Sequence, residues 1–300
     1  MTAAATDHIP PDGEQERPSP PSGQVPRRIA LLVLLVVALT WSISGLDISM
    51  ERLRSAPGDA WKIFRFMFPP DFSGEIERGV IGKVFESVYI AWIGTIIAAT
   101  ISLPLAFLAA TNVAPMWIRV PVRQLFNAIR AVPELIVAVV LLAVTGLGPW
   151  AGALAIGLHS VGTLGKLSTE TIESSDPGPV EAVEACGGRW ISGMRWGVLP
   201  QVLPIIVSYW LFRFEINIRA SAVLGMIGAG GVGSELVQQL NFRNFDAVGA
   251  VLIFTVGVVL IIDTVSSAVR RRIIQGSGRK VDDSSRDAEA LNDLTGIEIR

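Results

Sequence analysis

Six apolar runs alternate with polar segments along this chain, and they leave few folds open to it. The runs cover about residues 29–46, 85–110, 131–145, 150–167, 201–218 and 247–269. An apolar stretch of about 20 residues can cross the hydrocarbon layer of a bilayer as one helix. The pattern therefore predicts an all-α, polytopic membrane protein with about six transmembrane helices.

The amino-acid composition agrees with a membrane protein and excludes several other classes. Half of the 300 residues are hydrophobic and only 17% are charged, whereas soluble domains carry about 25% charged residues. The net charge of −2 gives no indication of a nucleic-acid partner. A single cysteine, Cys186, excludes an intramolecular disulfide, and the two histidines, His8 and His159, lack metal-ligand spacing. Neither a metal site nor a cofactor is predicted.

Polar segments flank the apolar part of the chain. Residues 1–26 are rich in Pro, Ser, Gly and acidic residues, and residues 273–300 are charged, so both are expected to be disordered tails. Residues 27–272 form the expected transmembrane domain. With both termini in the cytoplasm, 16 Lys and Arg fall on the cytoplasmic side and 9 outside, which is the direction of the positive-inside bias. We therefore expect a multi-pass protein of the plasma (inner) membrane with cytoplasmic tails.

One polar loop is too charged to cross a bilayer and has a regular internal pattern. Residues 179–204 read PVEAVEACGGRWISGMRWGVLPQVLP. Asp176 is a suitable N-cap for a short helix that Gly187 and Gly188 stop, and a second short helix is expected to end before Pro200. A helix–glycine–helix element held between two spans is stiff enough to transmit motion from a soluble partner.

The spacing within residues 176–200 resembles the EAA coupling loop of ABC importer permeases. In that loop Glu-Ala-Ala is followed by Gly and then by Leu-Pro. This chain departs from it with Val183 in place of the second Ala and with Gly197 where Ile is usual. The resemblance implies that an ATP-binding subunit contacts the loop on the cytoplasmic side. The expected coupling residues are those that match the motif, namely Glu181, Ala182, Gly187, Leu199 and Pro200.

Four polar residues near the end of the fifth apolar run form a second candidate site. Ionisable side chains at membrane depth are costly and are functional candidates by default. Glu215 and Arg219 are four residues apart and are expected to pair on one helix face. In one interpretation the group lines a translocation path; in the other, the arginines reach the outer interface and the pair is structural. The residues concerned are Arg213, Glu215, Asn217 and Arg219.

A glycine-rich stretch, GAGGVG, follows this group. It satisfies the G-x-G-x-x-G string of dinucleotide-binding folds, but neither a soluble strand nor a βαβ unit surrounds it. We interpret it as a break between helical segments that lines the path, with backbone N–H groups available as a small anion-binding nest. The glycines concerned are Gly228, Gly230, Gly231 and Gly233.

Longer stretches of the chain are similar to the PhnE family, the permeases of phosphonate importers. They are FRFEINIRASAVLGMIGAGGVG, FPPDFS, VPELIVAVV and GLGPWAGALAIGLHSVGTLGKL, and the resemblance covers about residues 60–272. It implies the type I importer fold, a homodimer in membrane lipid, an ABC ATP-binding subunit dimer and an extracytoplasmic phosphonate- or phosphate-binding protein. Because relatives in that family are associated with phosphonate, phosphite or phosphate, it also implies a small phosphorus oxyanion as substrate.

The chain lacks G-x-x-x-x-G-K-[ST], so ATP hydrolysis is expected in a partner and this chain is expected not to be an enzyme. The expected function is the permease subunit of an ATP-driven importer. The alternatives are a permease for another small anion, a membrane-embedded enzyme, or an ion-coupled secondary transporter using Glu134, Glu215 and His159. Glu134 is instead expected to stabilise the start of the third span, and His159 to be a buried, hydrogen-bonded residue.

Overall fold

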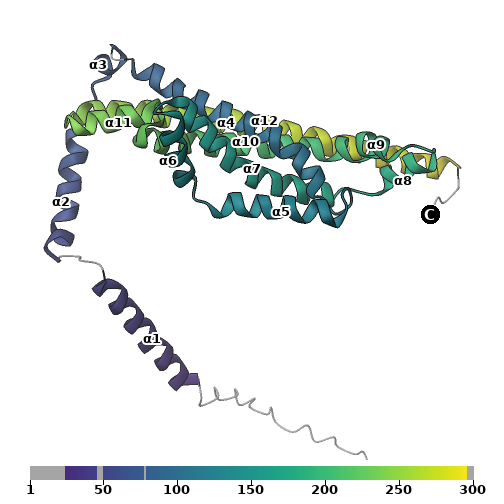
Figure 1. The fold of residues 1–300 in the computed structure, drawn as a ribbon, viewed down its shortest axis with the longest axis horizontal. Helices are drawn as coiled ribbons and strands as arrows, with labels where there is room; N and C mark the ends of the chain where they lie inside the picture. Colours follow the sequence, from purple (N-terminus) through teal and green to yellow (C-terminus); the bar gives the residue numbers. More distant parts are fainter. Residues whose placement is uncertain (1–23, 46–49, 78, 296–300) are drawn as a thin grey trace, which may run out of the picture. The chain divides into compact units, whose positions relative to one another are not determined.

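The computed structural model describes residues 24–45, 50–77 and 79–295 of the chain (Figure 1). Within these ranges the regular secondary structure is entirely helical, as predicted. The chain divides into two compact units, residues 1–62 and 63–300. Most of the predicted N-terminal tail, residues 1–23, lies outside the described part of the chain.

The first unit contains α1 (Gln24–Ser44) and most of α2 (Met50–Phe66). α1 corresponds to the first predicted span, and its stretch Arg27–Ser44 is apolar enough to cross a membrane. Its large apolar side chains are exposed, Leu34 by 65% for example. A helix that is apolar on all sides needs lipid or protein around it, which agrees with the prediction of a span.

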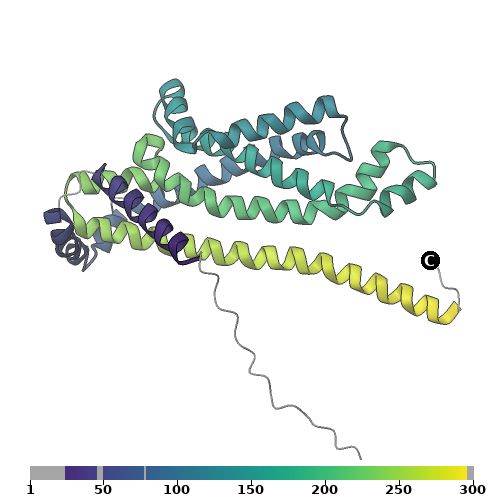
Figure 2. The ribbon, with the colours of Figure 1, turned by 90° about the horizontal axis from the view of Figure 1, so that it is seen from below.

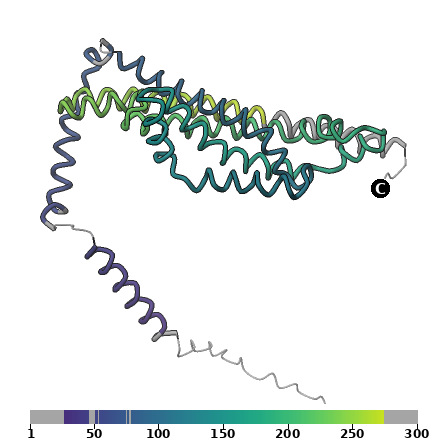
Figure 3. Tube along the Cα trace, in the orientation of Figure 1, coloured from purple at the N-terminus to yellow at the C-terminus, as the bar shows by residue number. Residues whose placement is uncertain are grey.

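Three long helices form the core of the second unit. α4 (Val80–Ala109), α7 (Pro149–Glu173) and α10 (Leu199–Leu224) pack against one another (Figures 1 and 3). α4 and α7 run in the same direction, because Gly94 meets Ile156 and Ala106 meets Thr169 further along both helices. α10 runs in the opposite direction. This alternation agrees with the order of the predicted second, fourth and fifth spans.

α7 lies where the fourth span was predicted and is the most enclosed of these helices. Of its 25 residues, 15 are buried, and most of these are Gly, Ala, Ser or Thr. Small side chains let neighbouring helices approach closely within a membrane. A helix that is surrounded by protein needs less apolar surface, which explains why α7 is less apolar than α4 and α6.

The third predicted span is broken in the structure. α5 (Met116–Ala131) and α6 (Glu134–Thr145) meet at an angle of 88°, and α6 has only 12 residues. At about 1.5 Å per residue, α6 is too short to cross a bilayer alone. The break follows from Pro133, because the residue before a proline is pushed out of the helical region and Val132 is extended here.

Three further elements of the second unit lie near the end of α4 at Val80. They are α3 (Phe72–Glu77), the π-helical turn η2 (Gly225–Ala229) and α11 (Gly231–Asn241). α12 (Phe245–Thr295) runs alongside α10 (Figure 2). α12 remains helical to Thr295, whereas the charged composition beyond residue 272 predicts disorder; the segment contains no proline to end the helix.

The described residues contain fewer clear membrane spans than the six predicted. Four helical stretches in the described residues are long and apolar enough to cross a membrane, and five if α5 and α6 count as one broken span. The predicted run that this count leaves out is the fourth, α7, which is enclosed by protein. Each of the six apolar runs is therefore helical, although one is bent and one is protected by protein.

Candidate functional site

The loop predicted to couple the chain to a partner begins with a short, well-capped helix. α8 (Gly178–Ala185) starts just after Asp176, whose carboxylate accepts a hydrogen bond of 3.0 Å from the N–H of Gly178. At the other end, Gly187 N–H donates to Glu184 O and Gly188 N–H donates to Val183 O, both at 2.8 Å. Gly187 has φ +77°. This is a Schellman motif, so the predicted glycine stop is present.

The second half of the loop differs from the prediction. α9 (Trp190–Ser192), the π-helical turn η1 (Gly193–Val198) and α10 form one continuous helix, so the expected end before Pro200 is wrong. The wider turn of η1 provides the reason. Leu199 N–H donates to Met194 O, five residues back, and Pro200 follows directly after this wider turn, as the second residue of α10. Movement of the loop is thereby connected directly to α10.

α8 packs against η1 at Gly197, one of the two positions at which the sequence departs from the EAA pattern. A Cβ on Gly197 would lie 2.8 Å from a methyl group of Val180, so an Ile at this position would not fit the present packing. A Cβ on Gly188 would lie 2.5 Å from a methyl group of Val183. The departure at Gly197 is therefore adapted to the packing of this loop rather than disruptive to it.

Gln201 is a residue of this site that sequence reasoning missed. Its side-chain oxygen accepts from the N–H of Asp176 at 3.0 Å, and its amide group donates to Asp176 O at 3.1 Å and to Gly197 O at 2.8 Å. Both ends of the loop are thus clamped at the start of α10. The sequence offered one signal, a polar residue directly after Leu-Pro at the beginning of an apolar run.

The motif residues of α8 face outwards. Glu181 and Ala182 are exposed, and within the described part of the chain no hydrogen bond or ion pair of the Glu181 carboxylate occurs. A carboxylate in the first turn of a helix is stabilised by the helix dipole and remains available to a basic group. This surface is therefore suited to a partner.

A second group of polar residues lies in the middle of the helix bundle. Asn217 is fully buried, donates to Thr95 Oγ1 at 2.9 Å and accepts from Ser160 Oγ at 3.2 Å. Arg213 Nε in turn donates to Ser160 Oγ at 2.8 Å. Thr95 is the sixteenth residue of the 30-residue helix α4. The group, which we call the central polar cluster, therefore lies about halfway along the longest core helix.

Arg213 also faces α6. Its Nη2 is 3.9 Å from Glu134 Oε2, and the two side chains are exposed by only 10% and 20%. Within the described part of the chain, neither Arg213 Nη2 nor Glu134 Oε1 has a hydrogen-bond partner. Charge-assisted hydrogen bonds are usually about 2.7–2.9 Å long, so this ion pair is incomplete. Glu134, expected to stabilise a helix start, does stand in the first turn of α6 and also faces this arginine.

The predicted pairing of Glu215 with Arg219 is wrong. Glu215 accepts from Arg270 on α12 at 2.8 Å, and Arg219 donates to Asp263, also on α12, at 2.9 Å. α12 runs antiparallel to α10 and offers a partner to each residue, so neither needs the other. Arg219 is the more accessible of the two, with its side chain 55% exposed against 8% for Glu215.

The glycine-rich stretch does break the helix, as predicted. Gly228, Gly230 and Gly231 have φ of +106°, +76° and +71°. The reversal packs onto α4, where Val232 N–H donates to Ser87 Oγ at 2.9 Å. Ser87 precedes Thr95 by two helical turns, so the break lies nearer than the central polar cluster to the Val80 end of α4. The Val232 N–H is already engaged and cannot serve an anion nest.

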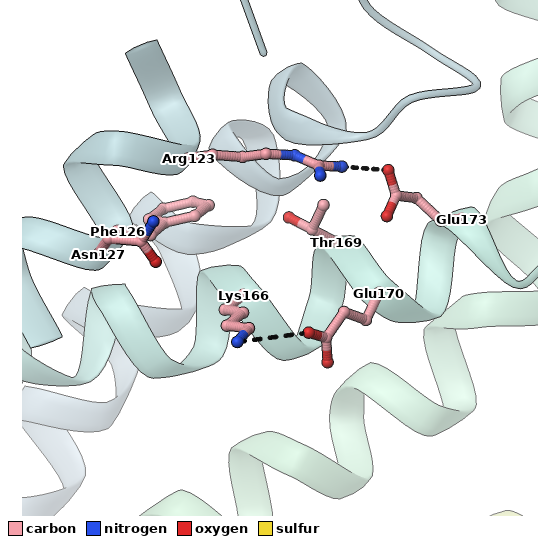
Figure 4. A pocket seen from close by; sticks show the side chains of 7 residues that line it. All are labelled: Arg123, Phe126, Asn127, Lys166, Thr169, Glu170 and Glu173. Carbon is pink, nitrogen blue, oxygen red and sulfur yellow. Dashed lines mark hydrogen bonds and ion pairs between the residues drawn. The ribbon is translucent and has the colours of Figure 1, made fainter. Parts of the chain in front are cut away.

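A cavity of about 250 Å³ lies between α5 and α7, near the loop (Figure 4). Arg123 pairs with Glu173, and Lys166 lies 3.7 Å from Glu170. Burial alone would raise the pKa of Glu173, but hydrogen bonds from Thr111 and the charge of Arg123 outweigh it, so this pKa lies below its ordinary value. Both basic residues already have acidic partners. We therefore assign these residues a structural role where α5 packs against α7.

A bundle of apolar helices with buried charges at half depth and a stiff surface loop defines a membrane transport protein. Residues 102–275 match the family of binding-protein-dependent transport system inner membrane components. The chain belongs to this family, whose members are transport components integral to the inner membrane.

Two curated relatives show how far the likeness extends. The chain is 39% identical over 245 residues to the phosphite transport system permease protein PtxC of Stutzerimonas stutzeri, which covers 81% of this chain and 88% of that one. It is 40% identical over 216 residues to the phosphate-import permease protein PhnE of Mycolicibacterium smegmatis, covering 71% of this chain and 40% of the longer relative.

Solved structures support the fold. The chain aligns with an amino acid ABC transporter at a TM-score of 0.56 and 19% identity, covering 67% of this chain and 98% of that chain. It aligns with the MetNI methionine ABC transporter at a TM-score of 0.57 and 20% identity, covering 67% and 97%. The fold is that of type I ABC importer permeases.

Proposed function

We propose that this chain is the permease subunit of an ATP-driven importer that moves a small phosphorus oxyanion, a phosphonate, phosphite or phosphate, across the inner membrane. The proposal rests mainly on sequence identity. Over 71–81% of this chain, about two residues in five are identical to those of a phosphite and a phosphate permease. The buried Arg213 supports it, because a guanidinium group suits phosphorus oxyanions.

The translocation path runs along α10 in this proposal. Arg213 and Asn217 lie at half depth within the central polar cluster, and Glu215 and Arg219 continue the polar strip toward α12. The break at Gly228, Gly230, Gly231 and Gly233 closes the path near the Val80 end of α4.

The exposed loop around α8 is the proposed docking surface for the ATP-binding partner. An ABC ATP-binding subunit dimer docks on the exposed face of α8 at Glu181 and Ala182, and ATP is hydrolysed there rather than in this chain. Gly187, Leu199 and Pro200 give the loop its shape, and Gln201 passes its motion to α10. Two copies of this chain form the pore, an extracytoplasmic binding protein delivers the anion, and both termini lie in the cytoplasm.

Uptake by cells tests the proposal. A strain that lacks this gene but keeps the rest of its transport system is supplied with labelled phosphate, phosphite or methylphosphonate, with and without the gene on a plasmid. We expect the gene to restore uptake of at least one of the three. Restored uptake of none of them, with the protein present in the membrane, contradicts the proposed substrate class.

A further inference from the structure

The break between α5 and α6 lies at the level of the central polar cluster. Glu134, the first residue of α6, faces Arg213, and His159, next to Ser160 on α7, lies against the backbone of Val132. Ala131, Val132 and Pro133 are nevertheless exposed in the single chain. An irregular, exposed backbone is therefore present about halfway along the bundle.

Lipid does not tolerate such a backbone at this depth. Non-helical segments within the hydrocarbon layer occur only where protein or a water-filled cavity surrounds them. The break must then face the partner subunit or the path. The start of α6 carries N–H groups without intrahelical acceptors and the positive end of a helix dipole, both of which favour an anion.

The side chains at this place are short of partners. Arg213 is nine-tenths buried, yet its Nη2 lacks a hydrogen bond, and so does Glu134 Oε1. His159, beside them, hydrogen-bonds the backbone of Val132. Buried charges normally complete their hydrogen bonds, because an incomplete ion pair is costly away from water. Two unsatisfied charged groups at one helix start indicate a place that a polar ligand completes.

We propose that Arg213 and the first turn of α6 form an oxyanion station at half depth, in which Glu134 is a tethered substitute for the transported anion. In the empty permease the Glu134 carboxylate holds Arg213 loosely at 3.9 Å. An arriving tetrahedral oxyanion takes its place, accepting hydrogen bonds from Arg213 Nη2 and from the N–H groups at the start of α6. When the anion leaves, Glu134 returns. This deepens the proposed function and rests on it.

The Glu134 carboxylate keeps the affinity of the station for an anion low, because it competes with the anion for Arg213. A permanent arginine in a low-dielectric site would retain an anion, whereas a competing carboxylate lowers the affinity and favours release. Removing the carboxylate should therefore raise the affinity and slow release. Ser160, which accepts from Arg213 Nε at 2.8 Å, holds the guanidinium group in place.

Equilibrium binding of labelled inorganic phosphate, phosphite and methylphosphonate to the purified permease–ATPase complex in nanodiscs, without the binding protein, tests the station. For whichever anion the wild type transports, Glu134→Gln should bind it about tenfold or more tightly than wild type and transport it more slowly. Arg213→Gln should lose this binding. Ser160→Ala leaves Arg213 in place but removes the hydroxyl that holds its guanidinium group, so it should weaken anion binding less than Arg213→Gln does.

The matched control is Glu170→Gln. It removes a carboxylate that lies 3.7 Å from Lys166, outside the station, and should leave the affinity unchanged. Equal affinity of wild type, Glu134→Gln and Ser160→Ala overturns the station even if the wild type transports normally. Absence of transport of all three anions by the wild type is a different result and counts against the proposed function instead.

Discussion

The side chain of Gln201 on α10 holds the backbone of Asp176 through two hydrogen bonds, at 3.0 and 3.1 Å, across 25 residues of loop. The loop therefore cannot tilt without pulling on the start of α10. Because Arg213 and Asn217 lie on the same helix, one rigid element joins the docking surface to the buried polar cluster. This is the structural basis for coupling in the proposed mechanism.

The first prediction concerns that clamp. Gln201→Leu removes three hydrogen bonds at the edge of the loop, each worth about 1 kcal/mol, while keeping an apolar helix start. We expect several-fold slower uptake with the ATP-binding subunit still attached, measured by uptake assays and by pull-down. Gln124→Leu on the exposed side of α5 is the control and should have little effect. Normal uptake in Gln201→Leu would leave the clamp without a role in coupling.

The second prediction concerns Gly187. Its φ of +77° costs a residue with a Cβ roughly 1 kcal/mol or more, and an aspartate also adds a negative charge at a helix C-terminus. Gly187→Asp should abolish uptake and weaken retention of the ATP-binding subunit in a pull-down. Gly187→Asn has the same size and the same Cβ but is neutral, so it should retain more of both. If the two variants behave alike, the charge at this position does not govern docking.

The third prediction concerns the glycine break. A Cβ on Gly230 would lie 2.6 Å from Glu86 Oε1 and 3.1 Å from Pro149, and φ there is +76°. Gly230→Val should therefore impair uptake while the protein remains inserted and bound to its ATPase. Gly257→Val on α12 meets open space within 4 Å and should transport nearly as wild type. Unimpaired uptake in Gly230→Val would remove the reason to place the break on the path.

The fourth prediction uses the single native cysteine. Cys186 is exposed in the loop next to Gly187, so it reports the side of the membrane on which the loop lies. A membrane-impermeant maleimide should label it in inverted vesicles and not in intact cells. Cys186→Ser is the control for background labelling. Labelling in intact cells would place the loop outside and reverse the proposed orientation.

Local features of the fold were predictable from the sequence. Gly187 ends α8 because a glycine with positive φ after a short helix is a local signal. The glycine break after Gly225 is local in the same way. Pro133 also carried a signal for the break between α5 and α6, but the uninterrupted apolar run that follows it suggested a single span.

Contacts between distant segments could not be predicted from one sequence. Glu215 has Arg219 four residues away, which is a plausible partner by helix geometry, yet it pairs with Arg270, 55 residues further on. Arg213 meets Glu134 across 79 residues of chain. Which of several charges become neighbours depends on how the helices pack, and periodicity within one helix contains no information about that.

ATP-driven accumulation in proteoliposomes measures the proposed transport activity itself. The chain is reconstituted with its ATP-binding subunit, ATP is enclosed in the lumen, and the binding protein is added outside with labelled phosphate, phosphite or methylphosphonate. We predict accumulation of at least one anion against its gradient, which stops without ATP and is lost in Gly187→Asp. Accumulation that continues without ATP and follows a proton or sodium gradient would contradict the account and favour an ion-coupled transporter.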